Sequence, residues 1–173
     1  MEDYNFFQRH KSIKGVKIKG TDRLFLLDFD NKNYHEIFDK EFGEFEIAGL
    51  YLLINTKKAK WEIYVGESTN VKTRNKGEIK KGFAGKMKNF EFDKIILIWD
   101  GRPTKTSLFG EDTFRKWLEK YCIQLFKNDD KYDCVNTTQK PKPTNFQTET
   151  MIANFKKHIL ALLKMNGLIN SKN

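Results

Sequence analysis

The tripeptides Gly-Leu-Tyr (residues 49–51) and Tyr-Val-Gly (residues 64–66) stand close together in the chain. Each belongs to a short apolar run, and a lysine-rich segment, residues 55–60, separates the two runs. Runs of this length and composition are typical of β-strands, so the pair predicts a hairpin. Side chains alternate along a strand, which turns Tyr51 and Tyr64 away from their aliphatic neighbours. One simple register then places the two tyrosines opposite each other, and two phenol hydroxyls project from one patch.

A glycine completes each tripeptide. Gly49 and Gly66 remove side-chain bulk next to the tyrosine rings. A large ligand, such as a nucleic-acid backbone, could therefore approach the strands closely. The alternative is that both tyrosines only pack at the edge of a hydrophobic core.

An arginine follows the second tripeptide. Arg74 stands ten residues after Tyr64, in a segment where Ser68 or Thr69 could cap a short helix. Such a helix would carry Lys72 and Arg74 back toward the hairpin. An arginine fork can bind two phosphate oxygens at once, so this placement indicates phosphate binding. A lone arginine at an ordinary surface position is the alternative.

The charge of the chain is positive and unevenly distributed. Its 32 Lys and Arg residues outnumber 23 Asp and Glu residues, which gives a net charge of +9. Between residues 57 and 88 there are ten basic and three acidic residues. A basic stretch beside the tyrosines suits neutralisation of backbone phosphates and favours nucleic acid as the partner, whereas simple solvation is the alternative. The lysines that we expect to contact DNA are Lys72, Lys76, Lys80, Lys81, Lys86 and Lys88.

A carboxylate lies on a predicted helix further along the chain. From residue 111 to 126 apolar residues recur at three- and four-residue spacing, which predicts an amphipathic helix. Glu119 follows Leu118 at the border of the apolar stripe, where a carboxylate can reach a cleft while its neighbours fill the core. The alternative is an ordinary solvated glutamate. Glu111 and Asp112 lie in the first turn, where interaction with the helix dipole explains them without any function.

The combination of Gly-Leu-Tyr, Tyr-Val-Gly, an arginine ten residues later and a glutamate on a downstream helix resembles the GIY-YIG nuclease family. This resemblance implies that Tyr51, Tyr64 and Arg74 line an active site on a small three-stranded sheet. It also implies that Glu119 binds one divalent metal ion, Mg²⁺ or Mn²⁺. Asn136 corresponds to an asparagine that the family often keeps near the metal and the phosphate, so we expect Asn136 to contact DNA.

The function implied by the resemblance is that of a metal-dependent endonuclease. It would hydrolyse phosphodiester bonds, with DNA as the favoured substrate, and leave a 5′-phosphate and a 3′-hydroxyl. The metal ion and Arg74 would stabilise the negative charge of an in-line displacement. Tyr51 would accept a proton from the attacking water, helped by the charge of Lys72 or Lys76. Tyr64 would orient the water or the phosphate.

One segment departs from the family pattern. Many relatives have a histidine or tyrosine a few residues past the arginine, where this chain reads RNKGEIKK. A nucleic-acid-binding module that keeps the scaffold without efficient catalysis is therefore the first alternative. A basic structural protein whose tyrosines only fill the core is the second.

The predicted elements give an α/β mixture of the α+β type. We expect a small three-stranded antiparallel sheet, flanked by helices, from strands at 47–54, 61–66 and 92–99. The predicted domains are an N-terminal arm (1–46), a GIY-YIG-like nuclease core (47–136) and a connector with a C-terminal helix (137–173). The remaining predicted elements are a strand at 24–29, short helices near 34–42 and from residue 69, and a helix at 148–164 that ends before Asn166-Gly167.

Other classes of protein are disfavoured by the composition. Cys122 and Cys134 form no C-x-x-C pair and the three histidines are scattered, so the sequence shows no zinc framework. No apolar run is long enough for a membrane-spanning helix, so we expect a soluble, cytoplasmic protein without a membrane partner. The oligomeric state is left open. One active site cuts one strand at a time, so a double-strand break would need a dimer or two successive events.

Overall fold

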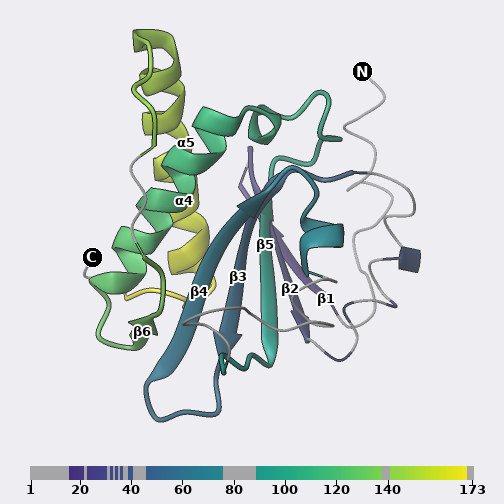
Figure 1. The fold of residues 1–173 in the computed structure, drawn as a ribbon, viewed down its shortest axis with the longest axis vertical. Helices are drawn as coiled ribbons and strands as arrows, with labels where there is room; N and C mark the ends of the chain where they lie inside the picture. The colour runs from purple at the N-terminus through teal and green to yellow at the C-terminus, as the bar shows by residue number, and fades with distance from the viewer. Residues whose placement is uncertain are drawn as a thin grey trace.

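The computed structural model describes residues 16–21, 23–30, 32, 34, 36, 39–40, 46–75, 89–137 and 141–170. These residues form one six-stranded sheet with two long helices packed against it (Figure 1). The strands are β1 (Val16–Gly20), β2 (Phe25–Asp30), β3 (Gly49–Asn55), β4 (Trp61–Ser68), β5 (Lys94–Trp99) and β6 (Tyr132–Cys134). The long helices are α4 (Asp112–Lys127) and α5 (Phe146–Met165), and a short 3₁₀ helix, η2 (Leu108–Gly110), precedes α4.

The strand order across the sheet is β1-β2-β5-β3-β4-β6. Every neighbouring pair is antiparallel except β4 and β6, which run parallel. The central strands β5, β3 and β4 are the three that the sequence predicts for the sheet, so the α+β class and the antiparallel centre are confirmed. The predicted number of three strands is wrong, because β1, β2 and β6 extend the sheet on both sides.

The added strands carry weak sequence signals. β1 reads VKIKG, in which lysines alternate with apolar residues, and β6 has only three residues. Both patterns are too short for periodicity to separate a strand from a loop. β2 agrees with the strand expected at 24–29, and its pairing with β5 makes it part of this sheet.

Both long helices agree with the amphipathic patterns. α4 begins one residue after the predicted start, and α5 extends slightly beyond its predicted range of 148–164 at both ends. The side chain of Asn145 caps α5 by accepting a hydrogen bond of 2.9 Å from the backbone N–H of Thr148. Gly167 follows the helix with a φ of 64°, which confirms the expected stop signal. Of the helix predicted near 34–42, the described residues 34, 36, 39 and 40 are helical.

Two apolar layers lie on opposite faces of the sheet. On one face Leu50, Leu52 and Ile54 of β3 join a cluster that contains the buried residues of α4 and α5. On the other face Tyr51 and Leu53 join a second cluster, against which Tyr64, Phe90 and Phe92 pack. The predicted alternation along the hairpin is therefore confirmed, and both tyrosines lie on the face away from α4 and α5.

The predicted register of the hairpin is wrong. Tyr51 pairs with Gly66, and Tyr64 pairs with Leu53, so each tyrosine is two residues away from the expected partner. Thr56 explains the shift, because its backbone N–H and hydroxyl bind the carboxylate of Asp93 at 2.7 and 2.5 Å and hold it in the loop. A shift of two residues keeps every side chain on its original face.

Candidate active site

The two tyrosines remain neighbours in spite of the changed register. Their ring centroids are 6.2 Å apart with an interplanar angle of 44°. Tyr51 is buried, with 1% of its surface exposed, whereas Tyr64 is half-buried. A diagonal pair of aromatic rings on one face of a sheet is within reach of direct contact. The hairpin thus places one phenol in the interior and one at the surface.

The two glycines serve this packing. A Cβ atom at Gly66 would overlap the ring and hydroxyl of Tyr51, and a Cβ at Gly49 would lie 2.5 Å from the carbonyl oxygen of Ile98. The expectation that these glycines leave room for a large ligand is therefore wrong. The space beside Gly66 is filled by the tyrosine of the neighbouring strand, and the space beside Gly49 by the backbone of β5.

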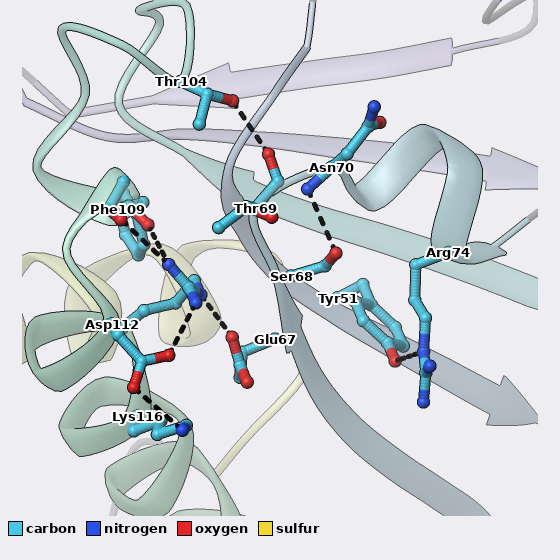
Figure 2. A network of polar contacts seen from close by, with 12 residues as sticks. Tyr51, Glu67, Ser68, Thr69, Asn70, Arg74, Thr104, Phe109, Asp112 and Lys116 are labelled. Atoms are coloured by element: carbon cyan, nitrogen blue, oxygen red, sulfur yellow. Dashed lines mark hydrogen bonds and ion pairs between the residues drawn. The ribbon is translucent and has the colours of Figure 1, made fainter.

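Arg74 reaches the buried tyrosine from a helical turn at residues 71–75. Its Nε atom donates a hydrogen bond of 3.3 Å to the Tyr51 hydroxyl (Figure 2). The cap of this turn differs from the prediction, because Asn70 accepts a bond of 3.2 Å from the backbone N–H of Thr73. Ser68 instead accepts a bond of 3.0 Å from the N–H of Asn70, which supports the cap.

Neighbouring segments hold this turn in place. Thr104 donates a hydrogen bond of 2.8 Å to the Thr69 carbonyl just before the turn. Asn75 is fully buried and donates a bond of 3.3 Å to the Tyr34 hydroxyl. Lys72 forms an ion pair of 3.2 Å with Asp39, so one of the lysines expected on DNA faces a carboxylate of the protein. The other five expected lysines, Lys76, Lys80, Lys81, Lys86 and Lys88, lie outside the described residues.

Glu119 lies on α4 and is half-buried. Burial, and after it the negative charge of Glu67, raise the pKa of its carboxyl group to about 7, whereas Lys116 and Arg115 act in the opposite direction. A carboxylate in such surroundings gains from a nearby cation. The environment of Glu119 therefore favours a ligand that carries positive charge.

A cleft of about 890 Å³ brings part of the predicted site together. Tyr64 of β4, Glu119 of α4 and Asn136, which follows β6, all line it. Tyr51 and Arg74 are not among its lining residues, and the contact between the two tyrosine rings connects them to it. The site therefore has an open part around Glu119 and Tyr64 and a buried part around Tyr51.

Asn136 uses its side chain to hold β4. Its Oδ1 atom accepts a hydrogen bond of 2.7 Å from the Val65 N–H, and its Nδ2 donates a bond of 2.6 Å to the Val65 carbonyl. The amide thus continues the contact with β4 two residues beyond the last pair of the β4–β6 ladder, Ile63 and Cys134. Because Val65 stands between Tyr64 and Gly66, these bonds position the tyrosine strand, and the DNA contact expected of Asn136 stays a prediction.

Sequence reasoning missed Arg115 and Glu67. Arg115 is buried on α4 and forms an ion pair with Glu67 at the end of β4. The same guanidinium donates a bond of 2.7 Å to the Phe109 carbonyl and contacts Asp112 at 3.0 Å (Figure 2). The one signal in the sequence is that Arg115 directly follows the apolar Phe114 within the amphipathic pattern of α4. An arginine is rarely buried without a partner, so this position indicates an ion pair. This network fixes α4, and hence Glu119, relative to β4.

The surroundings of Glu119 fit a magnesium-type ion. Within the part of the chain that the structure describes, no three His, Cys, Asp or Glu side chains gather as a complete metal cage. Mg²⁺ usually keeps several waters and binds through one or two carboxylates together with substrate phosphates. Glu119 is a single carboxylate in the lining of an open cleft, and its surroundings disfavour a negative charge without a cation. Both features suit that pattern.

The fold and the site together define a small α+β domain in which two neighbouring strands, a helical turn and a helix carry two tyrosines, an arginine and a glutamate. The family model of the GIY-YIG catalytic domain matches residues 47–133, half of the chain, and the chain belongs to this family. Membership implies a nuclease-type function, and nucleases of this family generally use divalent metal ions. No curated protein and no solved structure matches the chain. None of the described helices is both long enough and apolar enough to cross a membrane.

Proposed function

We propose that this protein is an endonuclease that hydrolyses phosphodiester bonds of DNA with one divalent metal ion, Mg²⁺ or Mn²⁺. The observation that carries the proposal is the meeting of Tyr64 and Glu119 in one open cleft, in a chain of the GIY-YIG family. The products would be a 5′-phosphate and a 3′-hydroxyl.

Each residue of the site has a proposed role, and the cleft supports those of Glu119 and Tyr64 directly. Glu119 would hold the metal ion, and the bound ion supplies neutralisation of the phosphate charge. Arg74 is exposed and would bind the phosphate through its guanidinium group. Tyr51 would accept the proton of the attacking water, with the positive charge of Arg74 beside its hydroxyl. Tyr64, which lines the cleft, would orient the water or the phosphate.

A nucleic-acid-binding module without efficient catalysis is the second candidate. The observation in its favour is the segment after Arg74, which reads RNKGEIKK and contains no histidine. A binding module would retain the cleft and its affinity for DNA, but it would make no metal-dependent cut. The two candidates therefore differ in a single assay.

The assay incubates the wild-type protein with supercoiled plasmid and with labelled single-stranded and branched DNA, in Mg²⁺, Mn²⁺ or EDTA. The Glu119→Gln variant removes the charge that would hold the metal ion. Glu111→Gln is the matched control, because Glu111 is exposed at the start of α4 and its side chain makes no capping bond.

We expect metal-dependent cutting by the wild type and by Glu111→Gln, and loss of cutting by at least 100-fold in Glu119→Gln. End-labelling of the products would establish the position of the phosphate. Binding of DNA by all three proteins without any cut would overturn the nuclease and favour the binding module.

A further inference from the structure

Four lysines line the cleft beside Glu119, and they differ in their partners. Lys58 pairs with Glu62 at 2.6 Å, and Lys116 pairs with Asp112 at 2.8 Å. The other two lining lysines, Lys120 and Lys142, have no carboxylate within ion-pair distance among the described residues. The cleft therefore offers two lysines that form no ion pair with a described carboxylate, although the charge of Asp112 acts on Lys142 at longer range.

Trp117 contacts both of these residues. Its indole Nε1 donates a hydrogen bond of 2.9 Å to the backbone carbonyl of Lys142, which fastens the segment before α5 onto α4. The ammonium group of Lys120 lies 5.0 Å from the centroid of the same indole ring. A cation over a tryptophan ring is held in a preferred position. Trp117 thus contacts two lysines on separate segments of the chain, one through its side chain and one through its backbone.

The size and lining of the cleft indicate which kind of anion could fit it. About 890 Å³ lies in the range of pockets that enclose a drug-sized ligand, roughly one or two nucleotides, and is too small for a duplex. Among the described residues, the aromatic side chains that line the cleft are Tyr64 and Phe90, and the half-buried Phe90 stacks on Phe92 with 6.1 Å between the ring centroids. Grooves for single-stranded nucleic acid combine positive charge along the backbone with aromatic rings under the bases.

We propose that the cleft binds one unpaired strand of nucleic acid, with Lys120 and Lys142 binding its backbone phosphates and Phe90 stacking against a base. The assignment rests on the proposed nuclease function, which supplies the identity of the polyanion. The preferred substrate is then DNA that is single-stranded or locally unpaired at the point of cleavage. A duplex reaches Glu119 only after local opening of its base pairs.

The test measures binding by fluorescence anisotropy in EDTA, with Glu119→Gln as the background so that no cut occurs. The probes are a fluorescein-labelled oligodeoxythymidine of about 12 nucleotides and a duplex of equal length. The variants in this background are Lys120→Ala with Lys142→Ala, and separately Phe90→Leu, which keeps an apolar side chain for packing. Lys157→Ala on α5 is the matched control, because Lys157 is exposed and does not line the cleft.

We expect the single strand to bind at least fivefold more tightly than the duplex. The double lysine variant weakens single-strand binding about tenfold and lowers the slope of log affinity against log salt by about 1.4, since each phosphate contact of a single strand contributes about 0.7. Phe90→Leu weakens binding about fivefold at an unchanged slope. Lys157→Ala changes neither quantity.

Equal binding of duplex and single strand, or an unchanged salt slope in the double lysine variant, would overturn the proposal. Its failure is separate from that of the nuclease. If the wild type cuts DNA while the lysine variant binds as before, the nuclease function is supported and the proposed binding of a single strand by these lysines is refuted. If the wild type never cuts but binding follows the expected pattern, the proposed binding of a single strand is supported and the nuclease function is refuted.

Discussion

At Glu119 the stability of the fold favours a protonated carboxyl group, whereas binding of a metal ion in the cleft requires an ionised one. Burial and the charge of Glu67 disfavour its ionised form and raise its pKa to about 7. A metal ligand must be ionised, so the same environment that favours a cation also favours a competing proton. Two predictions follow from this competition, one for metal binding and one for stability.

Metal affinity should depend on pH through Glu119. Below about pH 7 the carboxyl group is protonated, so we expect Mn²⁺ binding and DNA cleavage to weaken as the pH falls through 7. Glu67→Gln removes the nearby negative charge that raises this pKa, and the midpoint should move to lower pH. Isothermal titration with Mn²⁺ and cleavage rates between pH 5 and 9 measure both effects. A midpoint that stays the same in Glu67→Gln would contradict the electrostatic explanation.

The stability of the folded state should show the opposite side of this effect. The folded pKa lies above the ordinary value of 4.5, so between these values the folded protein holds a proton that the unfolded chain has released. Stability from this group is therefore lost as the pH rises through that range. Glu119→Gln, which carries no charge, should raise the free energy of unfolding at pH 8 by about 1 kcal/mol, after allowance for the partial exposure of the side chain.

Urea denaturation at pH 8 and pH 4 measures this difference, with Glu111→Gln as the control for loss of a charge on α4. The gain should vanish at pH 4, where Glu119 is protonated in both states. A Glu119→Gln variant that is less stable than the wild type at pH 8 would show that the carboxylate contributes to the fold.

Among the elements, the helical turn at 71–75 depends on support from a segment far away in the sequence. The Tyr34 hydroxyl lies 3.4 Å from the Val71 carbonyl, to which it donates, and accepts a bond of 3.3 Å from Asn75. Tyr34 lies outside the matched residues 47–133. Arg74 stands on this turn, so its position depends on a residue that the family pattern does not include.

Tyr34→Phe should therefore affect both stability and activity. The change removes the hydroxyl that accepts a bond from the buried Asn75 amide and donates to the Val71 carbonyl, which should cost about 1–2 kcal/mol of folding free energy. Displacement of Arg74 should lower kcat more than it raises KM. Tyr132→Phe is a matched control, because the buried hydroxyl of Tyr132 has no hydrogen-bond partner among the described residues and its removal should not destabilise the fold. Equal effects of the two substitutions would contradict this explanation.

Arg115 connects α4 to β4 and should be the residue whose loss most weakens that contact. Arg115→Met removes the guanidinium partner of the half-buried Glu67 carboxylate. It also removes the hydrogen-bond donor to the Phe109 carbonyl. We expect a loss of about 3 kcal/mol in the free energy of unfolding, since a buried charge is costly once its partner is removed. The double variant with Glu67→Gln should recover part of the loss, and a double-mutant cycle by urea denaturation measures the coupling. A coupling of zero would show that the two side chains act independently.

Over the whole molecule, the sequence predicted what depends on local pattern. The strands β3, β4 and β5 and the helices α4 and α5 have strong apolar periodicity, and the tyrosines, Arg74 and Glu119 stand in a recognisable order. The register of the hairpin was not predictable, because it depends on the contact of Thr56 with Asp93 from another part of the chain. The pair of Arg115 with Glu67 was missed for the same reason, since 48 residues separate the two side chains.

The sheet also decides how much of the chain is needed for a stable fold. The matched residues 47–133 include the centre of the sheet but leave out β2, which pairs with β5 along six residues. They also leave out α5, whose buried residues complete the core on the helical face. Without these elements, the outer edge of β5 and the apolar surface of α4 would meet water.

A fragment of residues 47–133 should therefore fail to fold cooperatively, although it contains the tyrosines, Arg74 and Glu119. The fragment 16–170 contains every described strand and helix and is the matched control. We expect a cooperative urea transition for 16–170, and for 47–133 a broad transition with binding of an apolar dye at low denaturant. Cooperative unfolding of 47–133 would mean that the core of the family is stable alone. In that case β2 and α5 would position the site, because the core would be stable without them.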